Sequence, residues 1–160
     1  MQWPCPSEDH PGTPFLHEGE FPTPDGKATF LPVPWRPSAE DTDDEYPLLL
    51  TTGRRLSTYH TGTQTRRAEA FGTLVDQEYL ELNPADAERL GVEDGGWVSV
   101  RSRRGALRVR ARRTDRSPEG TVFMSFHFAE TAVNELSSTA LDPTTRTPEF
   151  KVCAVAVAPE

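Results

Sequence analysis

The sequence has few cysteines and no long hydrophobic run. Cys5 and Cys153 are the two cysteines among 160 residues, and neither has the CxxC or Cys/His spacing of a zinc or iron–sulfur site. No apolar stretch approaches the roughly 18 residues of a membrane span, and the opening Met1-Gln2-Trp3-Pro4 is not a signal peptide. We therefore expect no metal site and no membrane span. Because isolated thiols fit a reducing compartment, we also expect a cytoplasmic protein.

Acidic residues and prolines are concentrated at the start of the chain. Residues 1–45 hold ten acidic and two basic residues, which accounts for the whole net charge of −8, and nine of the 15 prolines. Residues 46–160 hold 15 acidic and 15 basic residues and are neutral. The sequence therefore predicts an extended, acidic, proline-rich lead segment over 1–45 and a compact domain over 46–160. The Pro24-Asp25-Gly26 turn signal predicts a small hairpin over 21–31.

Hydrophobic alternation in residues 46–160 predicts a mainly β domain. Strands are expected at 46–52, 75–82, 121–128 and 150–157, with a hairpin over 97–113 that turns at 102–105. Helices are expected at 84–90, between a capping Asn83 and a terminating Gly91, and at 129–136. About six short strands with two short helices are typical of a small β-barrel and not of a doubly wound sheet.

The hairpin over 97–113 carries seven arginines. Such a run can indicate nucleic-acid binding. Here no aromatic residue is interleaved for base stacking and the domain is neutral. An outward strand face covered by solvated arginine is the better interpretation, so we expect no nucleic-acid partner.

Residues 51–67 form the stretch that carries the functional signal. This stretch is rich in hydroxyl side chains, holds four arginines, two glycines and His60, and contains no acidic residue. Such a loop suits the binding of phosphate or of a polar ligand edge. His60 has no carboxylate within five residues, and His127 fits a core or rim histidine among three phenylalanines. No paired carboxylates and no GxxxxGK[ST] or GxGxxG motif accompany the loop. The residues thus indicate binding, with no catalytic set.

Four segments together carry a resemblance to a known family. They are YPLLLTTGRRLSTYHTGTQTRR (46–67), YLELNPADAERLGVEDGGWVSVRSRRG (79–105), GTVFMSFHFAETAVNELS (120–137) and DPTTRTPEFKVCAVAV (142–157). Their order and spacing resemble the carboxyl-terminal, molybdopterin-dinucleotide-binding domain of the large molybdenum or tungsten oxidoreductases, most similarly the catalytic (alpha) subunit of formate dehydrogenase. Residues 3–30 resemble the stretch that precedes this domain, so the resemblance covers nearly the whole chain.

The resemblance implies a fold and a set of site residues. The fold would be a six-stranded double-psi β-barrel with two or three short helices, closing over a bis-molybdopterin guanine dinucleotide that holds molybdenum or tungsten. Arg54 would pair with the pyrophosphate, Lys151 would add a charge, and Asn134 would contact a ring edge. Lys151, Asn134 and Phe126 fit structural roles equally well. The positions implied to contact the cofactor are Thr52, Gly53, Arg54, Arg55, Leu56, His60, Thr61, Gly62, Thr63, Phe126, Asn134 and Lys151.

The resemblance also implies that the chain is a fragment of an enzyme. The whole protein would oxidise formate to CO2 and pass the electrons to the metal and then to iron–sulfur clusters. Its partners would be the remaining domains of the catalytic subunit and iron–sulfur or diaphorase subunits. The family's catalytic residues and metal ligands lie in domains that this chain does not have, so we expect the isolated chain to be inactive. The alternative is a stand-alone double-psi barrel that binds a nucleotide or a protein partner.

Overall fold

The computed structural model describes residues 2–74 and 77–160. The chain divides into two compact units, Met1–Arg36 and Pro37–Glu160. Residues 37–45, which the sequence placed in the lead segment, thus belong to the barrel unit in the structure. None of the helices in the described part of the chain has the length and hydrophobicity needed to cross a membrane.

The first unit contains a turn in place of the expected hairpin. The Phe21 N–H donates to the Gly26 carbonyl at 3.0 Å, and the Gly26 N–H donates to the Thr23 carbonyl at 3.1 Å. Residues 28–31, expected to form the second arm, lie in no strand. The turn signal was therefore correct and the strand pairing was wrong. A two-stranded hairpin needs a packed face to be stable, and the Phe30 side chain is fully exposed.

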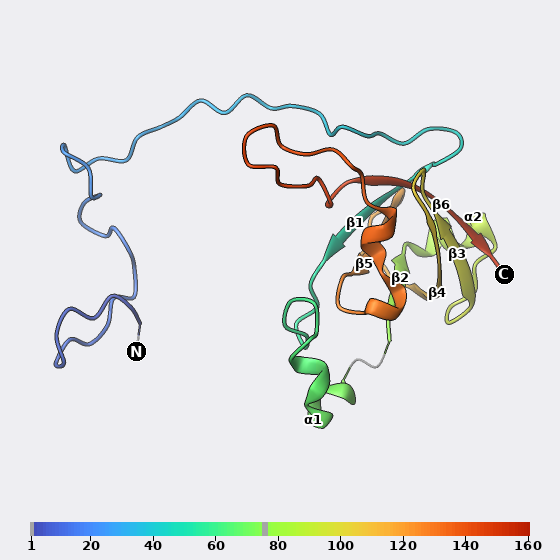
Figure 1. Ribbon diagram of the computed structural model, residues 1–160, viewed down its shortest axis with the longest axis horizontal. Coiled ribbons are helices and arrows are strands. Elements are labelled where there is room, and N and C mark those ends of the chain that lie inside the picture. The colour runs from blue at the N-terminus through green and yellow to red at the C-terminus, as the bar shows by residue number, and fades with distance from the viewer. Residues whose placement is uncertain (1, 75–76) are drawn as a thin grey trace. The chain divides into compact units, whose positions relative to one another are not determined.

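The second unit is a closed barrel of six strands (Figure 1). The strands are β1 (Leu48–Gly53), β2 (Tyr79–Leu82), β3 (Trp97–Arg101), β4 (Ala106–Arg113), β5 (Thr121–Ser125) and β6 (Cys153–Pro159). Their order around the barrel is β1-β5-β2-β4-β3-β6. The β1/β5 and β2/β4 pairs are parallel and the other four are antiparallel. The expected mainly β, six-stranded barrel is confirmed.

Alternating side chains fill the barrel. Leu48 and Leu50 of β1 are buried, as are Val98 and Val100 of β3. They join one hydrophobic cluster with the inward residues of the other strands, which include Leu80, Leu82, Val109, Val122, Met124 and Val155. The alternation of apolar residues in the sequence therefore identifies correctly which side chains face the inside of the barrel.

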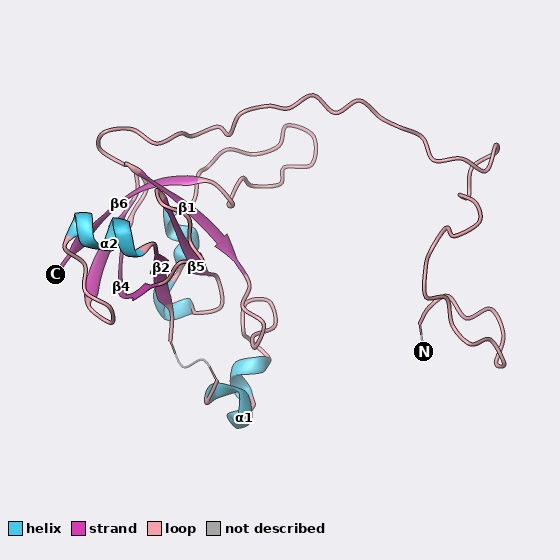
Figure 2. Cartoon of the chain, turned by 180° about the vertical axis from the view of Figure 1, so that it is seen from behind, coloured by secondary structure: helices cyan, strands magenta, loops and turns pink. Residues whose placement is uncertain are grey.

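The helices of the barrel unit are short and lie at its ends and sides (Figure 2). They are η1 (Thr65–Arg67), α1 (Glu69–Gly72), α2 (Pro84–Leu90), η2 (Ala129–Thr131) and η3 (Val133–Leu136). Helix α2 has the expected ends, since the Asn83 side chain accepts the Ala85 N–H at 2.9 Å and Gly91 has a φ of 69°. The single helix expected over 129–136 is wrong. Ala132, with φ −73° and ψ 81°, divides it into two 3-10 turns.

Four strands are shorter at one end than the sequence suggested. Strand β1, expected from residue 46, begins at Leu48. Strand β2 begins at Tyr79, and the expected residues 75–76 lie outside the described residues. Strand β5 ends at Ser125 because its parallel pairing with β1 ends at Gly53. Strand β6 begins at Cys153, where its pairing with β1 begins. Residues after β5 and before β6 line the cavity described next.

Candidate functional site

The loop that leaves β1 is tightly coiled. Gly62 has a φ of 76° and His60 a φ of 50°, so two residues adopt left-handed backbone. A Cβ at Gly62 would lie 2.8 Å from the His127 carbonyl oxygen. The absence of a side chain at Gly62 therefore lets the loop press against the segment that follows β5.

A cavity of about 580 Å³ opens at the end of β1 where this loop begins. Four separate parts of the chain form it: the β1 loop, the residues after β5, η3, and the residues before β6. It is lined by Arg54, His60, Thr61, Phe126, Asn134, Phe150 and Lys151. All except Phe150 are positions that the sequence had singled out, and the fold brings them together. Among the residues that the structure describes, no acidic residue lines the cavity.

Two cations face this cavity without an acidic partner. Lys151 Nζ donates to the Thr52 carbonyl at 2.5 Å, and the Thr52 hydroxyl donates to the Phe150 carbonyl at 2.8 Å. The Arg54 guanidinium lies 6.0 Å from the centre of the Phe126 ring. Within residues 2–74 and 77–160, neither Arg54 nor Lys151 takes part in an ion pair. The cavity is therefore electropositive in a chain of net charge −8.

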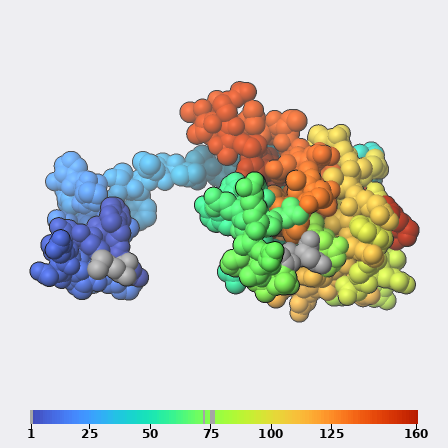
Figure 3. All heavy atoms as spheres, turned by 60° about the horizontal axis from the view of Figure 1, so that its bottom comes forward, coloured from blue at the N-terminus to red at the C-terminus, as the bar shows by residue number. Residues whose placement is uncertain are grey.

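Gly62 and Thr63 lie beside the cavity. With Thr61, Arg66, Arg67 and Ala129 they line a hollow of about 270 Å³. Arg66, which lines this hollow, forms an ion pair with Glu130 of η2 at 2.6 Å. Figure 3 shows the green β1-loop and α1 segment and the orange η2–η3 segment side by side on one face of the barrel unit.

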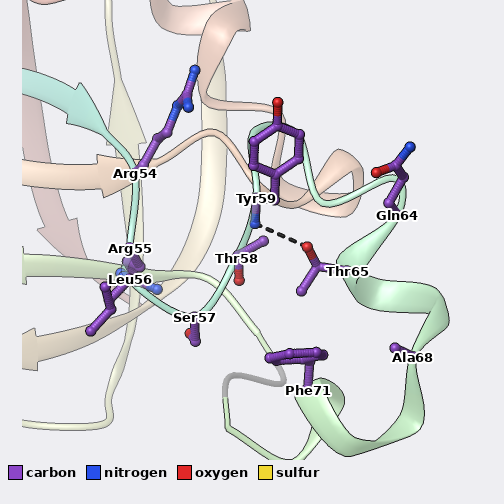
Figure 4. Close-up of a pocket in the computed structure, with 10 residues that line it drawn as sticks. All are labelled: Arg54, Arg55, Leu56, Ser57, Thr58, Tyr59, Gln64, Thr65, Ala68 and Phe71. Atoms are coloured by element: carbon purple, nitrogen blue, oxygen red, sulfur yellow. Dashed lines mark hydrogen bonds between the residues drawn. The ribbon is translucent and has the colours of Figure 1, made fainter. Parts of the chain in front are cut away.

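Arg55 and Leu56 line a different hollow, of about 550 Å³, between the β1 loop and η1–α1 (Figure 4). The Leu56 side chain is fully exposed there. The Tyr59 N–H donates to the Thr65 hydroxyl at 3.0 Å across the top of this hollow. The Arg55 side chain is only 12% exposed, and its Nη2 lies 2.9 Å from Glu78 Oε1. Its charge is thus compensated inside the protein, unlike that of Arg54.

Glu78 is a buried residue that the sequence did not single out. It accepts the Ser125 N–H at 3.2 Å and the Tyr79 N–H at 3.0 Å, and the Ser125 hydroxyl also donates to it. Burial raises the pKa of Glu78 above its ordinary value, although the Arg55 charge and the Ser125 hydrogen bonds act in the opposite direction. In an alternating stretch a glutamate is expected to face outward, so no local pattern marks it.

His127 is fully buried, which fits the core role considered from the sequence. Its Nε2 accepts the Arg55 N–H at 2.8 Å, and its Nδ1 contacts the His60 carbonyl. Both contacts are more than 60 residues away along the chain. Sequence spacing therefore gave no sign of them.

Thr52 and Gly53 are buried at the end of β1. A Cβ at Gly53 would lie 2.8 Å from a ring carbon of Phe123. Both residues support the cavity from behind through backbone and hydroxyl contacts. The expected positions thus divide into those that line the main cavity, those that line its neighbours, and those that hold β1 in place.

Comparison with known proteins gives this site a context. Residues 48–154 match the family described as molydopterin dinucleotide binding domain. The F420-dependent formate dehydrogenase 2 subunit alpha of Methanococcus maripaludis is 45% identical over 157 residues, which is 98% of this chain and 23% of that protein. Formate dehydrogenase H of Escherichia coli is 39% identical over 162 residues, which is 99% of this chain and 23% of that protein. The assimilatory nitrate reductase catalytic subunit of Bacillus subtilis is 40% identical with the same coverage.

A solved structure shares the fold. Acetylene hydratase from Pelobacter acetylenicus superimposes with a TM-score of 0.62 at 20% identity, over 71% of this chain and 18% of that one. The chain spans about a quarter of the length of the curated relatives named above, 23% in each case. Because the family match runs from the start of β1 into β6, the chain belongs to the molydopterin dinucleotide binding domain family.

Proposed function

We propose that the barrel unit binds the dinucleotide part of a bis-molybdopterin guanine dinucleotide within a larger formate dehydrogenase. The observation that carries this proposal is the cavity of about 580 Å³ that presents Arg54 and Lys151 and no acidic side chain. A pyrophosphate group is anionic, and guanidinium and ammonium groups are the side chains that bind it most strongly.

The side chains present fit this cofactor. Arg54 and Lys151 supply positive charge, and the Thr61 hydroxyl adds a donor. The Asn134 amide carries both donors and an acceptor, which suits the edge of a guanine or pterin ring. The half-buried Phe126 ring offers an apolar face to a planar heterocycle.

The other expected positions have supporting parts in the proposal. Gly62 and Thr63 extend the polar wall next to the cavity. Thr52 and Gly53 hold the end of β1, and Arg55 and Leu56 shape the loop behind it. When bound, the cofactor supplies two-electron chemistry through its molybdenum or tungsten. The residues of this chain bind and orient it.

The proposal extends to the whole protein. Relatives named as formate dehydrogenases support the oxidation of formate to CO2 as its reaction. The remaining domains of the catalytic subunit, with iron–sulfur or diaphorase subunits, are the proposed partners. The first unit, Met1–Arg36, is the proposed lead segment toward those domains. The exposed Leu56 side chain in the hollow of about 550 Å³ supports a covered face there. The free thiols of Cys5 and Cys153 support a cytoplasmic location. The parallel β1/β5 and β2/β4 pairs support the double-psi form of the barrel.

The test is a titration of the 160-residue chain with molybdopterin guanine dinucleotide, and with guanosine diphosphate as a simpler probe, followed by amide NMR. We expect shifts at residues 52–63 and near Phe126, Asn134 and Lys151. Arg54→Ala should weaken binding about 10-fold, because a charged hydrogen bond to phosphate is lost.

Arg116→Ala is the matched control, since Arg116 is exposed and lines none of the cavities described above. It should bind as the wild type does. Equal affinities of the wild type and Arg54→Ala, or shifts confined to the far side of the barrel, would contradict the proposal.

A further inference from the structure

We propose that His127 is a positioning residue whose imidazole bridges Arg55 and His60 and so holds the β1 loop in its ligand-ready conformation. The part of this inference that concerns binding rests on the function proposed above. The bridge itself rests on geometry within the chain.

The ring contacts both sides of one short loop. Nε2 accepts the Arg55 N–H at 2.8 Å, and Nδ1 contacts the His60 carbonyl. The histidine side chain is 0% exposed, so water does not compete for either contact. Arg54, directly before the first contact, and His60, at the second, both line the cavity.

The two partners fix the protonation state of the ring. A backbone N–H can only donate, so Nε2 must be an unprotonated acceptor. A backbone carbonyl can only accept, so Nδ1 must carry the proton. The neutral tautomer with its proton on Nδ1 is therefore the single form of the ring that satisfies both contacts.

The bridge also compensates an unfavourable backbone. His60 has a φ of 50°, which is costly for a residue with a Cβ. The contact of its carbonyl with His127 and its edge-on approach to Phe126, at 5.9 Å between ring centres, stabilise this conformation. The Phe126 and His127 rings are themselves 5.6 Å apart. The residues after β5 thus set the position of the cavity wall opposite them.

A histidine with a purely structural role in the core would form its hydrogen bonds within the barrel. In the described part of the chain, both hydrogen-bond partners of the His127 ring belong to the loop and none belongs to a strand. Loss of the ring contacts should therefore loosen the loop more than the barrel. This difference separates a positioning role from a general structural one.

The experiment compares the wild-type chain with His127→Leu and His127→Gln. Leucine has neither a donor nor an acceptor, while the glutamine amide has both. In the wild type, nitrogen NMR of the imidazole should show a neutral ring protonated on Nδ1. In His127→Leu we expect the Arg55 amide to exchange with solvent about 10-fold faster or more, with the amides of β3 and β4 unchanged.

Binding provides the second measurement. Guanosine diphosphate should bind His127→Leu about 10-fold more weakly than the wild type, and His127→Gln should recover most of both losses. Equal acceleration of exchange in loop and barrel, or no acceleration at Arg55, would overturn the proposal.

Two outcomes separate this proposal from the proposed function. If the wild type does not bind the probe while Arg55 exchange responds as expected, the proposed function fails and the bridge stands. If His127→Leu does not fold, nitrogen NMR of the wild-type imidazole provides the test. A ring protonated on Nε2 or on both nitrogens would refute the bridge.

Discussion

Arg54 and Arg55 are neighbours in the sequence and have different environments in the structure. Arg54 faces the cavity beside Phe126, and Arg55 is held inside by Glu78. Both side chains line the hollow of about 550 Å³, but only Arg54 also lines the cavity of about 580 Å³. The family resemblance implied that both contact the cofactor, because both fall within the matching motif over 46–67. Glu78, the residue that distinguishes them, lies more than 20 residues away.

Gly62 gives a test at the residue scale. Gly62→Ala places a Cβ 2.8 Å from the His127 carbonyl oxygen at a φ of 76°. Gly120→Ala has the same φ of 76° and meets nothing within 4 Å. We expect Gly120→Ala to lower the free energy of unfolding by about 1 kcal/mol and Gly62→Ala by roughly 2–4 kcal/mol.

Urea unfolding of the two variants measures the difference. The backbone conformation is matched, so the extra loss at Gly62 reports the close approach of the loop to the residues after β5. Equal losses at the two glycines would show that the loop can move away from His127 without cost.

Residues 37–46, here called the strap, are the clearest case at the scale of the element. Glu40 lies 2.6 Å from Arg103, pairs with Arg104, and accepts the Ala154 N–H at 3.1 Å. Arg104 also donates to the Leu136 carbonyl at 2.8 Å. One carboxylate thus joins the strap to the β3–β4 turn, η3 and β6, and this explains why residues 37–45 belong to the barrel unit.

The strap should make stability depend on pH. Burial acts to raise the pKa of Glu40, but hydrogen bonds from Arg104, Ala154 and Arg103 outweigh it, so the pKa lies below its ordinary value of 4.5. A lowered pKa in the folded state gives stability that is present above the unfolded pKa and is lost as pH falls through the folded pKa.

We therefore expect the free energy of unfolding of the wild type to be about 1–2 kcal/mol larger than that of Glu40→Gln at neutral pH. This advantage should shrink as the pH falls below 4.5. Urea unfolding of both chains from pH 3 to pH 7, at about one-unit steps, measures it. A difference in free energy of unfolding that stays constant from pH 3 to pH 7 would contradict the role assigned to Glu40.

Elements with local signals were predictable from the sequence. Helix α2 has its cap, its proline and its terminating glycine within nine residues, and the β3–β4 turn forms as expected, with the Ser102 N–H donating to the Gly105 carbonyl at 2.9 Å. The ends of β5 and β6 were not predictable, because they depend on pairing with the distant strand β1. The split between η2 and η3 at Ala132 has no local signal in the sequence. The contacts of the arginines in β4 could not be predicted from the sequence either. Arg108 and Arg110 lie over Trp97, at 3.9 and 4.3 Å from its ring centre, although no aromatic residue stands between them in sequence.

At the scale of the whole molecule, the proposed function makes the site one wall of a larger structure. The cavity brings together residues whose positions were implied by family resemblance, while local patterns predicted only that the β1 loop binds something polar. Composition alone could not assign Asn134 or Lys151, because a single polar residue on a helical turn or before a strand has no distinguishing pattern. The chain spans 23% of the length of relatives that are named as a formate dehydrogenase alpha subunit and as formate dehydrogenase H.

The isolated chain should therefore show no turnover with formate. Its cavity offers charge and hydrogen bonds for binding, and the redox step requires the metal end of the cofactor. Dye reduction by the purified 160-residue chain in the presence of formate is the measurement, with the complete enzyme as the positive control. Sustained dye reduction by the chain alone would show that it contains a complete active site.

The pairing of β1 has a consequence for how the protein is made. Leu49 of β1 is paired with Thr121 of β5 on one side and with Ala154 of β6 on the other. During synthesis β1 therefore leaves the ribosome long before either partner. One of its edges stays open until β5 is made and the other until β6 is complete. Folds dominated by such distant pairings form slowly, and open strand edges attract other chains. Truncation by a premature stop before residue 153 should thus yield an aggregating product, whereas an equally short loss from the first unit leaves the ring of strands able to close.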